Sequence, residues 1–318
     1  MLINKQYRAD LLLFLITAFW AVGCLLMKIG LNDLQPFNLV ALRFIISVVV
    51  TGFIFYKRVF RADLQTVKLA FALAVVLFGV FMTAAYGIQG TTVSNAGFLT
   101  AIPVAFVPIF SVVFFRQRTD GKTLTGIVLT VAGVALLTLN GSFSVNPGDG
   151  LCVLCSVIYA LYMILIDKIT PRVDAIALSI IQFLFVGLFC LAFSAAFETT
   201  KLPTTAGSWL IVLAMSLLAT SAAFIIQAMV QKDTTPVHAG IIFGTEPLFT
   251  AIIAAAFLGE KLSTPGYLGG MILMIGIFVI EFDWKRLTKL QDPALENLSK
   301  QAMVEEARAN GKAHQNAD

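Results

Sequence analysis

Charge is scarce in this sequence. Only 13% of the 318 residues are Asp, Glu, Lys or Arg, against about 25% in an ordinary soluble domain, while 58% are hydrophobic. Twelve of the charged residues fall at positions 283–318, so the first 282 positions are almost free of charge. These facts exclude a soluble enzyme, a nucleic-acid-binding module and a disordered protein. The net charge of +4 is too small to indicate a nucleic-acid partner. A multi-pass protein of the lipid bilayer remains.

Histidine and cysteine are scarce as well. The chain has two histidines and four cysteines, and all four cysteines fall inside apolar runs. It contains no His-Glu-x-x-His run and no phosphate-binding loop of the Gly-x-x-x-x-Gly-Lys-Ser/Thr type. We therefore predict no cofactor, no metal and no hydrolysis of ATP through such a loop. An intramembrane enzyme, which would need converging acids, bases and ligands, is kept as an alternative.

Long apolar runs dominate the chain. A helix that crosses a membrane needs about 20 mostly apolar residues, and the runs are too long and too continuous for strands. They also lack the two-residue alternation of a membrane β-barrel. The fold class predicted is all-α, with ten transmembrane helices at 11–29, 37–56, 69–88, 95–115, 123–140, 150–169, 175–197, 208–230, 237–258 and 265–282.

The basic residues between the runs predict the orientation. With the N-terminus in the cytoplasm, fifteen Lys and Arg residues lie in or beside cytoplasmic connections, against two, Lys201 and Lys261, in outer ones. Both termini are therefore expected in the cytoplasm, with the chain in the cell membrane. Residues 283–318 hold six acids and six bases and are expected to form a poorly ordered cytoplasmic tail.

The chain repeats itself at two offsets. We divide it into a first half, 1–145, and a second half, 146–282, each with five spans. Because five is odd, the second half enters the membrane from the opposite side, and inverted repeats of this kind occur in secondary transporters. The positions that match at offsets of 139 or 143 include Trp20 with Tyr159, Arg43 with Gln182, Gly126 with Gly269, and Gly133 with Gly276.

Three stretches carry a resemblance to a known family. They are 34–44, 97–108 and 246–263, the last of which contains Gly259-Glu260-Lys261. Each half resembles the EamA domain of the drug/metabolite transporter superfamily. The resemblance covers about residues 11–282 and implies ten helices, a plasma-membrane location and export or exchange of small metabolites. The sequence departs from the family at Arg116-Gln117-Arg118, where a Gly-Glu-Arg type ending is expected.

Two charged residues lie deep inside predicted spans, where charge is costly and marks function. Glu246 lies nine residues into its span, about 13 Å deep, and burial there would favour the neutral acid. It could therefore take up and release a proton, and Pro247 could kink the helix beside it. Arg43 could hold an anionic substrate group or pair with Glu246. Structural roles for both residues are the alternatives.

Several uncharged or weakly basic residues complete the candidate substrate-binding and coupling site. Asn95 and His238 occupy matching positions near the mouths of their spans, and His238 could relay protons. Thr245 shares a helical face with His238. The remaining candidates, which could equally be packing residues, are Trp20, Tyr159 and Gln182. Lys28 is expected to extend toward the membrane interface.

Glycines seven apart predict one packing face. Gly126 with Gly133, and Gly269 with Gly276, would let the fifth and tenth spans pack closely, although the same face could form a dimer. The chain is accordingly expected to be a monomer or homodimer. The function predicted is secondary transport of a small-molecule substrate, such as an amino acid or organic acid, by alternating access and with possible proton coupling. A channel or receptor is a further alternative.

Overall fold

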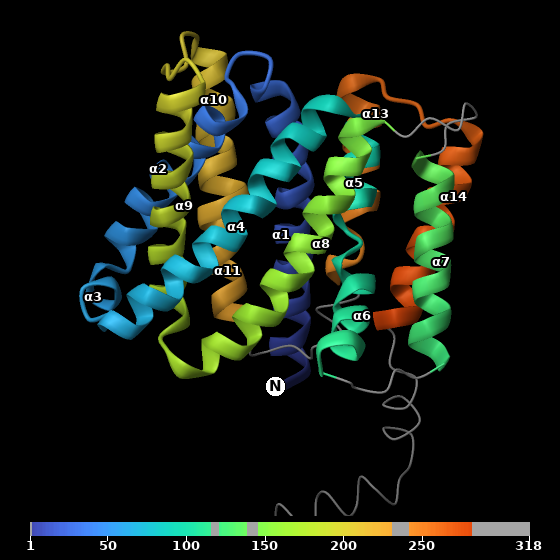
Figure 1. The fold of residues 1–318 in the computed structure, drawn as a ribbon, viewed down its shortest axis with the longest axis horizontal. Helices are drawn as coiled ribbons and strands as arrows, with labels where there is room; N and C mark the ends of the chain where they lie inside the picture. Colours follow the sequence, from blue (N-terminus) through green and yellow to red (C-terminus); the bar gives the residue numbers. More distant parts are fainter. Residues whose placement is uncertain (1, 116–120, 139–145, 231–241, 282–318) are drawn as a thin grey trace, which may run out of the picture. The chain divides into compact units, whose positions relative to one another are not determined.

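A computed structural model of the chain describes residues 2–115, 121–138, 146–230 and 242–281. Within these ranges every regular element is a helix, which confirms the all-α prediction for this part of the chain (Figure 1). The helices are α1 Leu2–Gly30, α2 Pro36–Ile54, α3 Tyr56–Val59, α4 Leu64–Gly90, α5 Val93–Thr100, α6 Pro103–Phe115, α7 Gly121–Thr138, α8 Pro147–Ile169, η1 Thr170–Arg172, α9 Ala175–Phe197, α10 Ala206–Ala214, η2 Met215–Ala222, α11 Ala223–Val230, α13 Glu246–Leu258 and α14 Thr264–Glu281.

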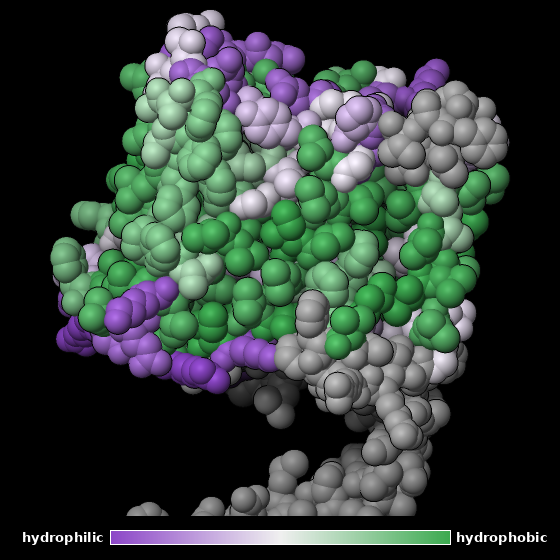
Figure 2. All heavy atoms as spheres, in the orientation of Figure 1, coloured by the Kyte–Doolittle hydropathy of each residue, from purple (hydrophilic) through white to green (hydrophobic). Residues whose placement is uncertain are grey.

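The helices are apolar enough to make this a multi-pass membrane protein. Seven described helical stretches have the length and composition to cross a bilayer. Three shorter apolar helices, Gly121–Leu137, Glu246–Leu258 and Thr264–Ile280, coincide with the predicted fifth, ninth and tenth spans. The count of ten therefore stays a prediction. Figure 2 shows hydrophobic side chains across the broad middle of the visible face, with hydrophilic ones gathered toward the helix ends.

Local sequence explains where the helices begin and end. Pro36 begins α2, where its missing N–H costs nothing. The side chains of Asp63 and Asp174 accept hydrogen bonds from the first turns of α4 and α9. Gly259 ends α13 in the left-handed conformation, at φ +65°, which glycine adopts without steric cost. These ends lie within a few residues of the predicted ones.

Two predicted spans are each interrupted. The fourth breaks at Ala101 and Ile102, between α5 and α6, and the ninth has a turn at Gly244 and Thr245, just before α13. The prediction of an unbroken helix over 95–115 was wrong, because Pro103 cannot donate the backbone hydrogen bond that would continue α5. The two breaks are 143 positions apart, which is the offset of the sequence repeat.

The helix contacts follow a paired scheme. Helix α2 packs on α9, α5 on α13, and α7 on α14. Helix α4, in the third span, packs on α8 and α9. Its counterpart in the eighth span, the stretch from α10 to α11, packs on α1 and α2. Exchanging the first five spans with the last five maps these contacts onto one another. The scheme is the one that two related halves would produce, and the boundaries 1–145 and 146–282 stay a prediction.

The glycine prediction is confirmed by the contact between α7 and α14 (Figure 1). A Cβ atom on Gly133 would lie 2.5 Å from the backbone nitrogen of Leu273, and one on Gly276 would lie 2.6 Å from the nitrogen of Thr130. Only glycine allows this approach of two backbones. The face that could have formed a dimer is thus covered within one chain.

The described helices all belong to one unit, Met1–Glu281. The predicted cytoplasmic tail, 283–318, lies outside the described residues, as do the candidate site residue His238 and the first residues of the predicted ninth span.

Candidate functional site

Glu246 is the first residue of α13, next to the break in the ninth span. The twelve residues from it to the end of α13 span about 18 Å, so Glu246 lies deep along the span. Its side chain is half-buried, and within the described residues its carboxylate makes no ion pair or hydrogen bond. The positive end of the α13 dipole favours a carboxylate there. An unpaired acid at a helix break is well suited to bind a proton or a cationic group.

Side chains satisfy the carbonyl groups that the two breaks expose. Ser156 of α8 donates its hydroxyl to the carbonyl of Leu99, at the end of α5. Thr245 donates its hydroxyl to the carbonyl of Ile242 at 2.6 Å, and this carbonyl also accepts from the Thr245 backbone nitrogen at 3.0 Å. Unsatisfied carbonyls are costly away from water, so both hydroxyls stabilise the broken backbone. Thr245 was predicted as a site residue, and the structure gives it this backbone contact.

Arg43 lies on α2 and is only 8% exposed. Its Nε donates to the hydroxyl of Thr220 at 2.8 Å, and its guanidinium lies over the ring of Phe81, 5.1 Å from the centroid. The two described salt bridges join other residues, so Arg43 does not pair with Glu246 in this structure. Of the two roles predicted for Arg43, the ion pair is absent within the described residues. Its charge stays available to an anion.

The partner of Arg43 lies in a π-helical stretch, η2. This stretch widens the helix so that the Thr220 hydroxyl also reaches the carbonyl of Met215, five residues back. π-Helical turns are rare and often occur at functional sites. Beside Thr220, the Ser221 hydroxyl is buried and has no hydrogen-bond partner within the described residues. The stretch thus holds three buried hydroxyl groups, those of Ser216, Thr220 and Ser221, and only that of Ser221 lacks a partner among the described residues.

Gln182 lies on α9, which packs against α2. Its Nε2 donates to the Tyr162 hydroxyl at 2.8 Å, whereas its Oε1 is buried without a partner among the described residues. Tyr162 stacks on Tyr159 with centroids 5.8 Å apart. The ring of Trp20 contacts that of Phe243, with centroids 5.2 Å apart, next to the break in the ninth span. Three sequence-predicted residues, Gln182, Tyr159 and Trp20, therefore take part in side-chain contacts within the helix bundle.

The charges of Glu246 and Arg43 act on a common neighbour. Both lie within electrostatic range of Cys24 on α1, and Glu246 is also within range of Tyr159. The charges of Glu246 and Arg43 therefore both reach the region around Cys24 on α1, as do those of Lys28 and Glu260.

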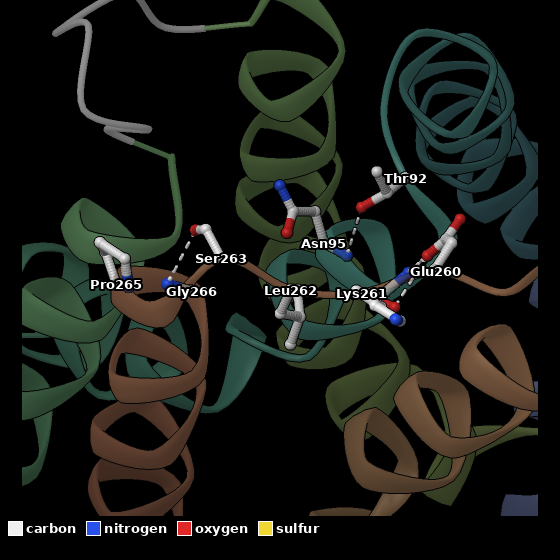
Figure 3. A pocket seen from close by; sticks show the side chains of 9 residues that line it. Thr92, Asn95, Glu260, Lys261, Leu262, Ser263, Pro265 and Gly266 are labelled. Atoms are coloured by element: carbon white, nitrogen blue, oxygen red, sulfur yellow. Dashed lines mark hydrogen bonds between the residues drawn. The ribbon is translucent and has the colours of Figure 1, made fainter.

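Asn95 lies apart from that region, in the first turn of α5. It is 7% exposed and lines a pocket of about 520 Å³ between the starts of α5 and α14 (Figure 3). Thr92 and Lys261 line the same pocket. This position at the mouth of the fourth span agrees with the sequence prediction, but it is a surface pocket and lies away from the helix breaks.

Sequence reasoning missed two carboxylates that join the halves. Glu198, after α9, accepts from the backbone nitrogens of Phe37 and Asn38 at 3.0 and 2.9 Å. Glu260, after α13, accepts from Val93 and Ser94 at the start of α5 in the same way. Each carboxylate stabilises a helix start in the other half through charge and hydrogen bonds. Both residues lie in polar connections between apolar runs, and nothing in the local sequence indicates a partner some 160 positions away.

Lys28 was expected to extend toward the interface, and the structure shows which groups its ammonium meets. Its Nζ donates to the carbonyls of Ile88, Gln89 and Thr91 at 2.8, 3.0 and 2.6 Å. These carbonyls end α4 and have no partner within that helix, so a cation is favoured there. Lys28 therefore ties α1 to the end of α4.

Comparisons with known proteins agree with this architecture. The EamA-like transporter family model matches residues 7–139 and 146–282. A protein named "Uncharacterized transporter" from Archaeoglobus fulgidus is 29% identical over 287 residues, covering 86% of this chain and 96% of the relative. "Uncharacterized transporter YetK" from Bacillus subtilis is 28% identical over 292 residues, covering 87% of this chain and 88% of the relative. A solved structure titled "Crystal structure of protein" shares the fold, with a TM-score of 0.65 at 19% identity, covering 90% of this chain and all of that one.

Proposed function

Because the chain belongs to the EamA-like transporter family, we propose that it is a secondary transporter of small carboxylate-bearing metabolites, such as amino acids or organic acids. The family and the names of the relatives indicate transport rather than catalysis. The chain is a multi-pass membrane protein. We place it in the cell membrane with both termini in the cytoplasm, on the strength of its basic residues.

The observation that carries the proposal is the matched pair of helix breaks. Interrupted helices at corresponding positions of two repeats point to the substrate site in transporters of this kind. The breaks at 101–102 and 244–245 are such a pair. The α5–α13 contact, where Gly97 meets Thr250, holds the two broken spans against each other.

Buried polar groups of the helix bundle favour a small charged substrate. Arg43 uses its Nε on Thr220 and retains its two Nη groups, which match the two oxygens of a carboxylate. The Gln182 Oε1 and Ser221 hydroxyl, buried without partners among the described residues, supply further polar contacts. Glu246 could receive an ammonium group or a proton. A zwitterion would use both charges, whereas an organic acid would use Arg43 alone.

Alternating access would expose this site to each side in turn. The two halves, 1–145 and 146–282, would be inverted repeats that rock against each other. Proton binding at Glu246 would shift the balance between the two states only if one of them binds the proton more tightly. We propose that this coupling drives export or exchange.

Reconstitution in liposomes tests the proposal. Purified protein is given a mixture of labelled amino acids and organic acids, with and without a pH gradient, and empty liposomes are the control. Uptake of a carboxylated compound that depends on the protein and rises with the gradient is expected. Protein-dependent transport restricted to uncharged compounds would contradict the substrate class, and transport indifferent to the gradient would contradict the coupling.

A further inference from the structure

A second acid with an unsatisfied oxygen lies at the start of α8. Asp149 is the third residue of α8 and is 1% exposed. Its Oδ1 accepts a hydrogen bond from the Thr91 hydroxyl. The Asn95 amide lies beside the carboxylate, yet the Oδ2 atom has no hydrogen bond of normal geometry within the described residues. A buried carboxylate oxygen without a partner is costly, so this position calls for a functional explanation.

The backbone around Asp149 is fixed by close packing. A Cβ atom on Gly148 would lie 2.5 Å from the carbonyl carbon of Gly90, and one on Gly87 would lie 2.7 Å from the sulfur of Cys152. The start of α8 is therefore held against the end of α4. Asp149 cannot swing out to water without separating these two helices, so a change in its charge acts directly on their contact.

The surroundings favour a proton over a metal ion. The carbonyls of Ile88, Gln89 and Thr91, which could have ligated a cation, already accept from the Lys28 ammonium. No group of three or more metal-ligating side chains occurs in the part of the chain that the structure describes. A single carboxylate with one hydroxyl donor is too few ligands for a divalent ion but is sufficient for a proton.

The charged and titratable groups around Asp149 come from two helices. Lys28 and Cys24 lie on α1, and both are within electrostatic range of Cys152 on α8, as is Asp149. Among the described residues the Lys28 ammonium bonds to the carbonyls at the end of α4, including that of Thr91, whose hydroxyl in turn donates to Asp149. The Asp149 carboxylate therefore has a hydroxyl and an amide beside it, and no salt bridge within the described residues.

A surface pocket lies one side chain away from Asp149. Asn95 lines this pocket between α5 and α14 (Figure 3). The same Asn95 amide lies beside the Asp149 carboxylate. Thr92, in the same pocket, directly follows Thr91, the hydrogen-bond donor to Asp149. Water in this pocket could therefore exchange protons with Asp149 across a single side chain.

We propose that Asp149 is a proton-binding site of this protein, loaded from the pocket that Asn95 lines. The carboxylate takes one proton on Oδ2, which then donates a hydrogen bond instead of lacking one. Protonation weakens the charge-assisted bond from Thr91 and loosens the contact between α4 and α8. The site would add a second coupling position to the transporter. Its role in coupling rests on the proposed function, whereas proton binding itself does not.

Infrared difference spectroscopy of the purified protein in nanodiscs tests proton binding without any substrate. The pH is varied and the stretching band of protonated carboxyl groups is recorded for wild type, Asp149→Asn and Asp63→Asn. Asp63 is the matched control, because it also bonds a threonine at a helix start but is exposed. Asp149→Asn is expected to lose one pH-dependent band of the wild-type spectrum, and Asp63→Asn is expected to retain it.

Two further measurements keep the proposal falsifiable. If Asp149→Asn does not fold, Thr91→Val removes only the hydroxyl donor and is expected to displace the same band, because carboxyl frequencies follow hydrogen bonding. Spectra of Asp149→Asn, or of Thr91→Val, that match wild type at every pH would overturn proton binding at Asp149. Failure of wild-type liposomes to transport would instead contradict the proposed function and leave the band unchanged.

Discussion

Arg43 on α2 and Thr220 on η2 are joined by a hydrogen bond of 2.8 Å between Nε and Oγ1. The bond links two helices that belong to different halves of the sequence repeat, and it exists because η2 is π-helical. It also leaves the outer end of the guanidinium without a carboxylate partner among the described residues. Arg43 is therefore held in place by a neutral group while its charge stays uncompensated, as a binding site for an anion requires.

Replacing Arg43 tests this arrangement. Arg43→Ala is expected to weaken binding of carboxylated substrates by roughly tenfold to a hundredfold, since a hydrogen bond to a charged group contributes about 1.5–3 kcal/mol. Thr220→Val should have a smaller effect in the same direction, because the guanidinium keeps its charge but loses its orientation. Competition binding on detergent-solubilised protein measures both. An equal loss for neutral and carboxylated compounds would show that Arg43 only supports the fold.

Glu246→Gln tests coupling. The substitution keeps the size of the side chain and removes the titration, so gradient-driven transport is expected to disappear while the folded protein stays in the membrane. Glu198→Gln is the control, because it removes a carboxylate that stabilises the start of α2 and makes no contact with the breaks. The control should lower thermal stability and keep the response to the pH gradient. Full gradient-driven transport by Glu246→Gln would remove this residue from the mechanism.

Glu260→Gln is expected to destabilise the junction between α13 and α5. The carboxylate accepts from two backbone nitrogens and from the Ser94 hydroxyl, at 2.8–2.9 Å. An amide keeps one acceptor oxygen and loses the charge, so the expected loss is about 1–3 kcal/mol of unfolding free energy. Thermal unfolding followed by fluorescence measures it. Ser94→Ala, which removes only the hydroxyl contact, should cost less. A stability of Glu260→Gln equal to wild type would contradict a stabilising role for the Glu260 carboxylate at the start of α5.

Sequence predicted the features that depend on local pattern. The glycine pairs on α7 and α14 repeat at one spacing, and apolar length alone defines the spans. The breaks depend on more than the local sequence, because the carbonyl freed at Leu99 is tolerated only where Ser156, 57 positions away, reaches it. The Glu260 cap depends on Val93, 167 positions away. A single sequence with mostly apolar residues carries no record of such pairings, nor of the bonds between Lys28 and the end of α4.

The loops that follow α1 and α9 give a pH dependence of stability whose sign can be worked out. A hydrogen bond from Ser208 and the charge of Lys201, whose Nζ lies 3.5 Å from Oδ1, hold the pKa of Asp33 below its usual range. A lowered pKa in the folded state means that the stabilisation is present above the ordinary value of about 4 and is lost as the pH falls below it. The difference in stability between wild type and Asp33→Asn should therefore shrink from pH 7 to acidic pH. A difference that stays constant or grows on acidification would contradict this.

The tight contact between α7 and α14 predicts a strong effect of a single methyl group. Gly133→Ala would put a Cβ atom 2.5 Å from the Leu273 nitrogen and 2.7 Å from the Gly269 carbonyl oxygen, both backbone atoms that cannot rotate away. The helices must separate, at an expected cost of about 1–3 kcal/mol.

Gly52→Ala is the matched control for that substitution, because Gly52 is also helical but has no atom within 4 Å of its Cβ position. It should be neutral or stabilising by about 0.5–1 kcal/mol, as expected from helix propensity alone. Thermal unfolding of both variants in the same detergent separates packing from propensity. Equal effects would mean that the two helices do not approach as closely as the structure shows, and the scaffold that holds the halves together would have to lie elsewhere.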